Sequence, residues 1–365
     1  MSVAANAPDY VRAISAYQPG KPISELAREL GLEEAGIVKL ASNENPLGMG
    51  ALARAAATEA MTEIARYPDG NGFELKAALS RRFALSAAQV VLGNGSNDVL
   101  DLVARALLGP GRDAVFSQYA FAVYPLATQS VGAKGVQVPA VNYGHDLDAM
   151  LTAITPATRV VFIANPNNPT GTFITGEVLL AFLARVPADV LVVLDEAYTE
   201  YLDESRRYDS VAWLARFPNL LVCRTFSKAY GLAGLRVGYG LGHPEVIDLL
   251  NRVRQPFNVS SIALAAATAA LDDQDFLIRS AELNRAGMAR IAAAMNEMGL
   301  ETIPSSGNFV TVKVGDAAGV NRRLLEQGVI VRPIAGYGMP EWLRVSIGLE
   351  SENARFIDAL RLALA

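Results

Sequence analysis

The 365-residue chain is longer than one hydrophobic core usually supports, so we expect two lobes. It is 51% hydrophobic and 19% charged with a net charge of −5, which is typical of a compact protein and leaves no basic surface for nucleic acid. The start, MSVAANAPDY, lacks the parts of a signal peptide, and no apolar run reaches the roughly 20 residues of a membrane span. We therefore expect a cytoplasmic protein without nucleic-acid or membrane partners.

The first 50 residues show one helical stretch, over residues 23–30, and two segments rich in turn residues, AYQPGKP and ASNENPLG. Such an arm is expected to pack over another part of the molecule or over a partner subunit. In NENP, the asparagines could simply cap the helix that follows. That helix is predicted over residues 51–65, before Pro68 and Gly70 stop it.

Between residues 89 and 225, short β-branched runs alternate with helical patterns. The expected strands are VVLG, DAVF, GVQV, RVVFIAN, VLVVLDEA and LLVCR, and the expected helices cover residues 99–107, 123–131, 146–153 and 177–184. Apolar strands interleaved with helices favour an α/β fold with a mostly parallel sheet covered on both faces. Functional side chains are then expected at the carboxyl ends of the strands.

Beyond Pro256 the pattern changes to a long helix, over residues 276–298, followed by NFVTVKV, VIVRP and LRVSIG. These runs predict a smaller, antiparallel sheet. We therefore expect an N-terminal arm, residues 1–50, that joins a small lobe, residues 256–365, and a large lobe over residues 51–255.

Disulfides and metal sites are not expected. Cys223 is the single cysteine, and its apolar surroundings predict a buried strand residue. His145 and His243 lie far apart in the sequence without the spacing of metal ligands.

The segment TFSKAYGLAGLRVGYG, residues 225–240, carries the most specific chemical signal. Lys228 follows an apolar strand, where an amine either reaches water or has its pKa lowered for use as a nucleophile. Arg236, after a glycine-rich bend, supplies a fork-shaped cation suited to phosphate, and Ser227 adds a hydroxyl. A phosphate-bearing aldehyde needs such groups. Without further motifs, Lys228 would be interpreted as a surface lysine in a strand-to-loop turn.

The pattern S-K-A-x-x-L-A-G-L-R-x-G resembles the lysine segment of fold-type I pyridoxal-phosphate (PLP) aminotransferases, and is similar in form to that of histidinol-phosphate aminotransferases. The resemblance covers nearly the whole chain. It implies PLP as the cofactor, bound covalently by Lys228, with Ser227 and Arg236 on its phosphate. It also implies a homodimer with shared active sites, in which Tyr67 reaches the cofactor phosphate of the other subunit; alternatively, Tyr67 is an aromatic residue that ends a helix.

A glycine-rich segment and an aromatic-rich segment each follow a predicted strand. In GNGSND, the backbone N–H groups at a helix start form an anion site, or an ordinary turn with a Ser or Asn cap. The resemblance implies that Ser96 and Asn97 bind the cofactor phosphate. In YAFAVYP, an aromatic ring can lie on a pyridine ring. The family pattern implies Phe121, with Tyr119 and Tyr124 as competing choices.

ANPNNPTG and LDEAY each end an apolar strand. By resemblance, the amide of Asn168 lies beside the ring oxygen of PLP, although a proline-rich surface loop is the alternative. A carboxylate at Asp195 needs a partner if buried, and a protonated pyridine nitrogen would serve; otherwise the segment is an acidic loop. Tyr198 would share the ring oxygen. Lys228, Asp195 and Tyr198 are thus the candidate catalytic residues.

The resemblance implies transamination of histidinol phosphate with 2-oxoglutarate, in histidine biosynthesis. It further implies that Tyr17, Arg332 and Arg344 contact the anionic end of the substrate, although the arginines could form surface ion pairs instead. Related alternatives are an aromatic amino acid aminotransferase and a PLP-dependent decarboxylase of phosphorylated amino acids. A nucleotide-binding module is the alternative without PLP, but GNGSND matches neither nucleotide-binding loop pattern.

Overall fold

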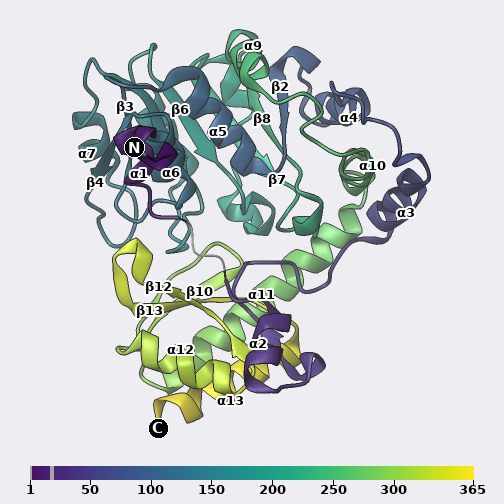
Figure 1. Ribbon diagram of the computed structural model, residues 1–365, viewed down its shortest axis with the longest axis vertical. Coiled ribbons are helices and arrows are strands. Elements are labelled where there is room, and N and C mark those ends of the chain that lie inside the picture. The colour runs from purple at the N-terminus through teal and green to yellow at the C-terminus, as the bar shows by residue number, and fades with distance from the viewer. Residues whose placement is uncertain (1, 17–19) are drawn as a thin grey trace.

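A seven-stranded sheet and a four-stranded sheet organise the chain, which we describe from a computed structural model over residues 2–16 and 20–365 (Figure 1). The order of the larger sheet is β2 (Val90–Gly93), β8 (Gly238–Gly242), β7 (Leu220–Thr225), β6 (Leu191–Asp195), β5 (Thr158–Ala164), β3 (Asp113–Ser117) and β4 (Lys134–Val138). The strands from β7 to β4 are parallel, and β8 is antiparallel to both of its neighbours. The predicted α/β architecture with a mostly parallel sheet is confirmed.

Helices cover both faces of this sheet, because the apolar runs VVFIA, LVVL and LLVC in its central strands place apolar side chains on both sides. One face packs against α5 (Ser96–Leu107), α6 (Val123–Ser130) and α9 (Pro244–Val253). The other packs against α3 (Ala51–Ala60), α4 (Phe73–Phe83), α7 (Leu147–Thr152), α8 (Gly176–Leu183) and α10 (Ser261–Ala270).

The smaller sheet is antiparallel, with the order β12 (Arg332–Ile334), β13 (Met339–Ser346), β10 (Phe309–Lys313) and β9 (Thr302–Ile303). Its core is shared with α11 (Gln274–Glu297), α12 (Ala317–Glu326) and α13 (Glu350–Leu364). The antiparallel arrangement expected for the C-terminal strands is therefore confirmed.

The N-terminal segment contacts both groups of elements. The short helix α1 (Asp9–Arg12) lies against α6, where Gln129 Nε2 donates to the carbonyl oxygen of Tyr10. Beyond it, α2 (Ile23–Leu30) packs against Ile37 and against Ile330 of β11 (Val329–Ile330), which pairs in parallel with β1 (Val38–Lys39). Short 3-10 helices complete the described chain, at Val3–Asn6, Glu34–Gly36, Met61–Glu63, Ala87–Gln89, Thr199–Tyr201, Glu204–Arg206, Ala212–Ala215, Ala233–Leu235 and Ala335–Tyr337.

The structure differs from the predicted elements mainly in helices and strands that were not predicted. The helix expected over residues 51–65 stops at Ala60 and continues as a 3-10 turn, and the helix expected from residue 99 already begins at Ser96. The glycine-rich strand β8 was not predicted, and neither were α4, α9 and α10. Within the described ranges, no helix is both long and apolar enough to cross a membrane.

The carboxyl ends of the central strands lie side by side at the edge that faces the smaller sheet (Figure 1). Ala164 pairs with Asp195, which in turn pairs with Cys223, and Thr225 pairs with Gly238. The candidate functional residues identified from the sequence lie in the loops that follow these strands.

The loop after β7 depends on one glycine. Gly231 has a φ of +70°, and a Cβ there would overlap the carbonyl oxygen of Gly48 in the N-terminal arm. We expect Gly231→Ala to lower the free energy of unfolding by about 2 kcal/mol or more. Gly234→Ala is the control, because a Cβ there meets no atom within 4 Å. Urea denaturation of both variants tests this, and equal stabilities would contradict it.

Candidate active site

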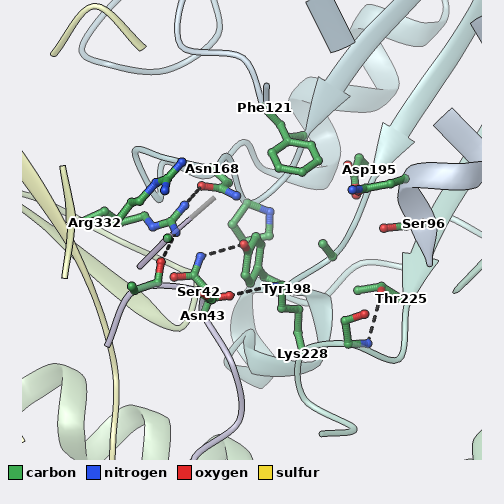
Figure 2. Close-up of a pocket in the computed structure, with 18 of the residues that line it drawn as sticks. Ser42, Asn43, Ser96, Phe121, Asn168, Asp195, Tyr198, Thr225, Lys228 and Arg332 are labelled. Atoms are coloured by element: carbon green, nitrogen blue, oxygen red, sulfur yellow. Dashed lines mark hydrogen bonds between the residues drawn. The ribbon is translucent and has the colours of Figure 1, made fainter. Parts of the chain in front are cut away.

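A cavity of about 180 Å³ lies where the carboxyl ends of β5, β6 and β7 face the smaller sheet (Figure 2). For comparison, an engineered cavity of about 150 Å³ holds benzene. The structure brings eleven of the residues expected from the sequence to its walls: Ser96, Asn97, Phe121, Asn168, Asp195, Tyr198, Ser227, Lys228, Arg236, Arg332 and Arg344. The pocket therefore has room for one substituted ring surrounded by polar groups.

Lys228 lies in the turn after β7, with its amine inside the pocket. Its Nζ donates to the carbonyl oxygen of Ser42, 3.0 Å away, in the N-terminal arm. Burial, with Arg344 nearby, lowers the pKa of Lys228 to about 7. The surface-lysine alternative is therefore wrong, and a large share of the amine is unprotonated and nucleophilic near neutral pH.

Asp195 ends β6 and is 4% exposed. Its Oδ2 accepts a hydrogen bond of 2.9 Å from the hydroxyl of Tyr124, while Oδ1 is buried and without a partner among the described residues. Burial raises the pKa of Asp195 to about 6, against the hydrogen bond from Tyr124, which lowers it. A buried carboxylate with one unused oxygen calls for a cationic or N–H partner in the cavity.

Cationic and N–H groups gather at the start of α5. Ser96 and Asn97 begin this helix, so its N-terminus and dipole favour an anion there. Arg236, in the left-handed region with a φ of +53°, donates to the Ser227 hydroxyl at 3.3 Å. Its guanidinium lies against Gly95, where a Cβ would overlap it. Because Gly95 is the N-cap residue, the expected alternative of a Ser or Asn cap is wrong.

The opposite wall comes from the smaller sheet. Arg344, buried on β13, donates to Asn168 Oδ1 at 2.6 Å and to the carbonyl oxygen of Ala41 at 2.8 Å. Arg332, at the start of β12, and Tyr337 line the same side. The surface-pair alternative is therefore wrong for Arg344, and the amide nitrogen of Asn168 is left for other partners because its oxygen is engaged by the arginine.

Tyr198 is buried on the wall between β6 and the N-terminal arm. Its hydroxyl accepts a hydrogen bond of 3.0 Å from Asn43 Nδ2, and burial raises its pKa to about 12. The amine of Lys228 lies 6.0 Å from the centre of its ring. Asn43 belongs to the NENP segment, whose asparagines do not cap α3, since the N-cap residue is Gly50. The helix-capping alternative for this segment is wrong.

The three aromatic candidates after β3 separate by position. Phe121 lines the pocket. Tyr124 stacks on Phe162 with ring centres 4.7 Å apart and directs its hydroxyl to Asp195. Tyr119 packs beside Tyr143, outside the pocket wall. Phe121 is therefore the aromatic ring that can cover a ligand ring.

One expected residue, Tyr67, is not brought to the pocket. Tyr67 is 84% exposed and stacks on Phe257, with ring centres 4.8 Å apart, so within this chain it does not reach the site. Tyr17 lies outside the described residues. Conversely, sequence reasoning assigned no role to Ser42, Asn43, Thr225 and Tyr337, which line the pocket. The NENP segment was the sequence signal for Asn43, but helix capping was the only role considered for its asparagines.

Comparisons with known proteins agree with this geometry. The model of the family "Aminotransferase class I and II" matches residues 35–360. The chain is 65% identical to "Histidinol-phosphate aminotransferase 1" of Cupriavidus pinatubonensis, over 98% of this chain and 96% of the relative. It is 62% identical to "Histidinol-phosphate aminotransferase 2" of Pseudomonas aeruginosa, over 97% and 96%.

Among solved structures, the chain resembles the histidinol-phosphate aminotransferase of Sinorhizobium meliloti, determined in complex with pyridoxal-5'-phosphate. The TM-score is 0.89 at 29% identity, covering 98% of this chain and 96% of that one. The expected fold-type I architecture is thereby confirmed. With the family match spanning all the pocket segments from Ala41 to Arg344, the chain belongs to the class I and II aminotransferases.

Proposed function

We propose that this chain is a PLP-dependent aminotransferase that transfers the amino group of histidinol phosphate to 2-oxoglutarate, giving imidazole acetol phosphate and glutamate. One observation carries the proposal: a half-buried amine with a lowered pKa, Lys228, and a buried carboxylate with an unused oxygen, Asp195, line the same small cavity. The relatives at 62–65% identity, which bear the histidinol-phosphate aminotransferase name, support this choice of substrate.

The donor set fits PLP. The unpartnered Oδ1 of Asp195 suits a protonated ring nitrogen, and the anion site formed by Ser96, Asn97 and Arg236 suits a phosphate. Phe121 would cover the ring, and Ser227 would add a hydroxyl to the phosphate. When bound, PLP supplies a ring that withdraws electrons from the reacting carbon of the substrate.

The chain's own groups then have separate tasks. With PLP bound, the neutral amine of Lys228 would be the nucleophile that holds the cofactor and the base that moves the proton at the substrate carbon. The carboxylate of Asp195 stabilises positive charge on the ring nitrogen. Asn168 and Tyr198 provide N–H and O–H donors for the ring oxygen. Arg332 and Arg344 supply guanidinium groups for the anionic end of the substrate.

We also propose a cytoplasmic homodimer with shared active sites. Large apolar side chains are exposed on α3, α4 and the adjoining turns: Leu52, Met61, Ile64, Tyr67, Phe73 and Phe257. Exposed apolar patches of this kind mark interfaces, and a partner over them would explain why Tyr67 turns away from its own pocket. We further propose that an N-terminal arm, residues 1–50, joins a small lobe, residues 256–365, and that residues 51–255 form the large lobe. Tyr17 is proposed to contact the substrate.

The first prediction concerns the acidity of Lys228. Because its pKa is lowered to about 7, the rate at which cofactor-free protein captures PLP should rise with pH and level off above about pH 7. An ordinary lysine would show a rate that still rises towards pH 10.4 or so. Borohydride trapping and mass spectrometry measure this rate. Lys228→Ala should abolish trapping and the visible absorbance, whereas Lys134→Ala, on the exposed start of β4, should change neither.

The second prediction concerns the charge of Asp195. Asn has the same shape but cannot carry the negative charge that a protonated ring nitrogen needs, so Asp195→Asn should lower kcat by about 100-fold or more. The cofactor should remain bound, since its phosphate and lysine contacts are untouched. Absorbance after gel filtration and steady-state kinetics test this together. Asp203→Asn, an exposed residue, is the control, and an unchanged kcat in Asp195→Asn would contradict the assignment.

The third prediction concerns the substrate. The phosphate of histidinol phosphate carries more negative charge and more acceptor oxygens than the carboxylate of phenylalanine. Two guanidinium groups at the anionic end should therefore favour histidinol phosphate by about 100-fold or more in kcat/KM, each with 2-oxoglutarate. Arg332→Gln should reduce the value for histidinol phosphate more than that for phenylalanine. Equal values in the unmodified protein would favour an aromatic aminotransferase, and CO2 release without glutamate formation would favour a decarboxylase.

A further inference from the structure

Asn43 uses every polar group that it has, although it lies in an irregular segment. It is 1% exposed and has a φ of +56°, in the left-handed region. Its N–H donates to Ser346 Oγ at 2.8 Å, and its carbonyl oxygen accepts from Asn308 Nδ2 at 3.0 Å. Its side-chain oxygen accepts from Ser346 Oγ at 2.9 Å, and its Nδ2 donates to the Tyr198 hydroxyl at 3.0 Å. A backbone in the left-handed region, in a residue whose polar groups all have hydrogen-bond partners, is a sign of a function for the residue.

Ser346 fixes which way the Asn43 amide faces. The hydroxyl of Ser346 accepts from the N–H of Asn43 and has one proton of its own, which goes to Asn43 Oδ1. If the amide were reversed, Ser346 would accept two hydrogen bonds and its proton would lose this acceptor in a buried place, at a cost. The nitrogen of the amide therefore faces Tyr198 (Figure 2).

The orientation of the Asn43 amide determines where the Tyr198 hydroxyl can donate a hydrogen bond. A phenol has one proton, and because its oxygen already accepts from Asn43, that proton must point away from Asn43. Tyr198 lines the cavity, and its burial keeps the phenol protonated at neutral pH. The available direction for the proton is the cavity itself.

We propose that Asn43 is a positioning residue, which commits the proton of the Tyr198 hydroxyl to the oxygen of the ring bound in the cavity. Ser346 lies on β13 of the smaller sheet, whereas Tyr198 follows β6 of the larger one. Hydrogen bonds connect Ser346 to Asn43 and Asn43 to Tyr198. The direction in which the Tyr198 hydroxyl donates its proton therefore depends on the position of the smaller sheet relative to the larger one. The inference rests on the proposed function, because it requires a cofactor oxygen that accepts this proton.

The test uses the visible absorbance of the lysine-bound cofactor in the full-length protein, titrated with pH. Asn43→Asp replaces the donor to Tyr198 by an acceptor of the same shape, so Tyr198 would donate to it and not to the ring oxygen. The ring oxygen would then become more electron-rich and the neighbouring nitrogen would hold its proton more tightly. We expect the pH at the midpoint of this titration to rise by about one unit, because losing one hydrogen bond to a charged group changes a pKa by about this amount. The same rise is expected for Tyr198→Phe.

A double-mutant cycle separates this effect from the added negative charge. If Asn43 acts through Tyr198, Asn43→Asp should shift the midpoint far less in the Tyr198→Phe background than in the unmodified protein. Equal shifts in both backgrounds would show an effect of charge alone and overturn the inference.

Ser346→Ala provides a second, milder variant, which removes the proton that orients the amide. It should shift the midpoint in the same direction by a smaller amount, and only when Tyr198 is present. No shift, or an equal shift in Tyr198→Phe, would count against the inference. Absence of the visible band from the unmodified protein would instead overturn the proposed function and the inference with it, so the two failures are distinguishable.

Discussion

The site depends on keeping two ionisable groups, Asp195 and Lys228, out of water in one cavity. Burial opposes charge on both, raising the pKa of the acid and lowering that of the amine, so that both approach neutral pH. Burying an unpaired charge is unfavourable in free energy, so the stability of the surrounding fold has to offset it. The rigid strands β6 and β7, paired from Val192 to Asp195, provide the support.

The remaining walls follow from how the two sheets meet. The parallel strands bring their carboxyl ends, with Asp195 and Lys228, to one edge, and the smaller sheet adds cationic side chains from the opposite side. Arg344 joins these halves directly, because it bonds both Asn168 in the larger group and the N-terminal arm. Its position also lowers the pKa of Lys228, so the seating of the smaller sheet affects the chemistry of the amine.

Much of this site could be predicted because each key residue follows a strand that is recognisable by its apolar run. VLVVL before Asp195 and LLVC before Lys228 are such strands, and parallel pairing then requires their ends to be neighbours. The strand β8 was missed because three of its five residues are glycine, which has low strand propensity. Here the glycines are needed where neighbouring side chains of Val91, Val99 and Leu221 come close.

Contacts between distant segments could not be predicted in the same way. That Tyr124 turns its hydroxyl to Asp195, rather than its ring to a ligand, depends on stacking against Phe162 of β5. That Asn43 meets Tyr198 depends on its hydrogen bonds to a residue 303 positions away. Local sequence patterns do not carry the three-dimensional distances on which these roles rest.

The N-terminal arm has a consequence for the order in which the molecule is built. Residues 40–43 bind β13 through the N–H of Ser346 to the carbonyl oxygen of Leu40 and through Arg344 to Ala41. This part of the pocket is therefore made from two segments that are separated by 303 positions between Asn43 and Ser346. During synthesis, the larger sheet can pair its strands early, whereas the arm must wait for β13 to leave the ribosome before it can take its place. Until then the pocket lacks the wall formed by Arg344 and residues 40–43, so the site around the amine of Lys228 can be completed only after β13 has been made.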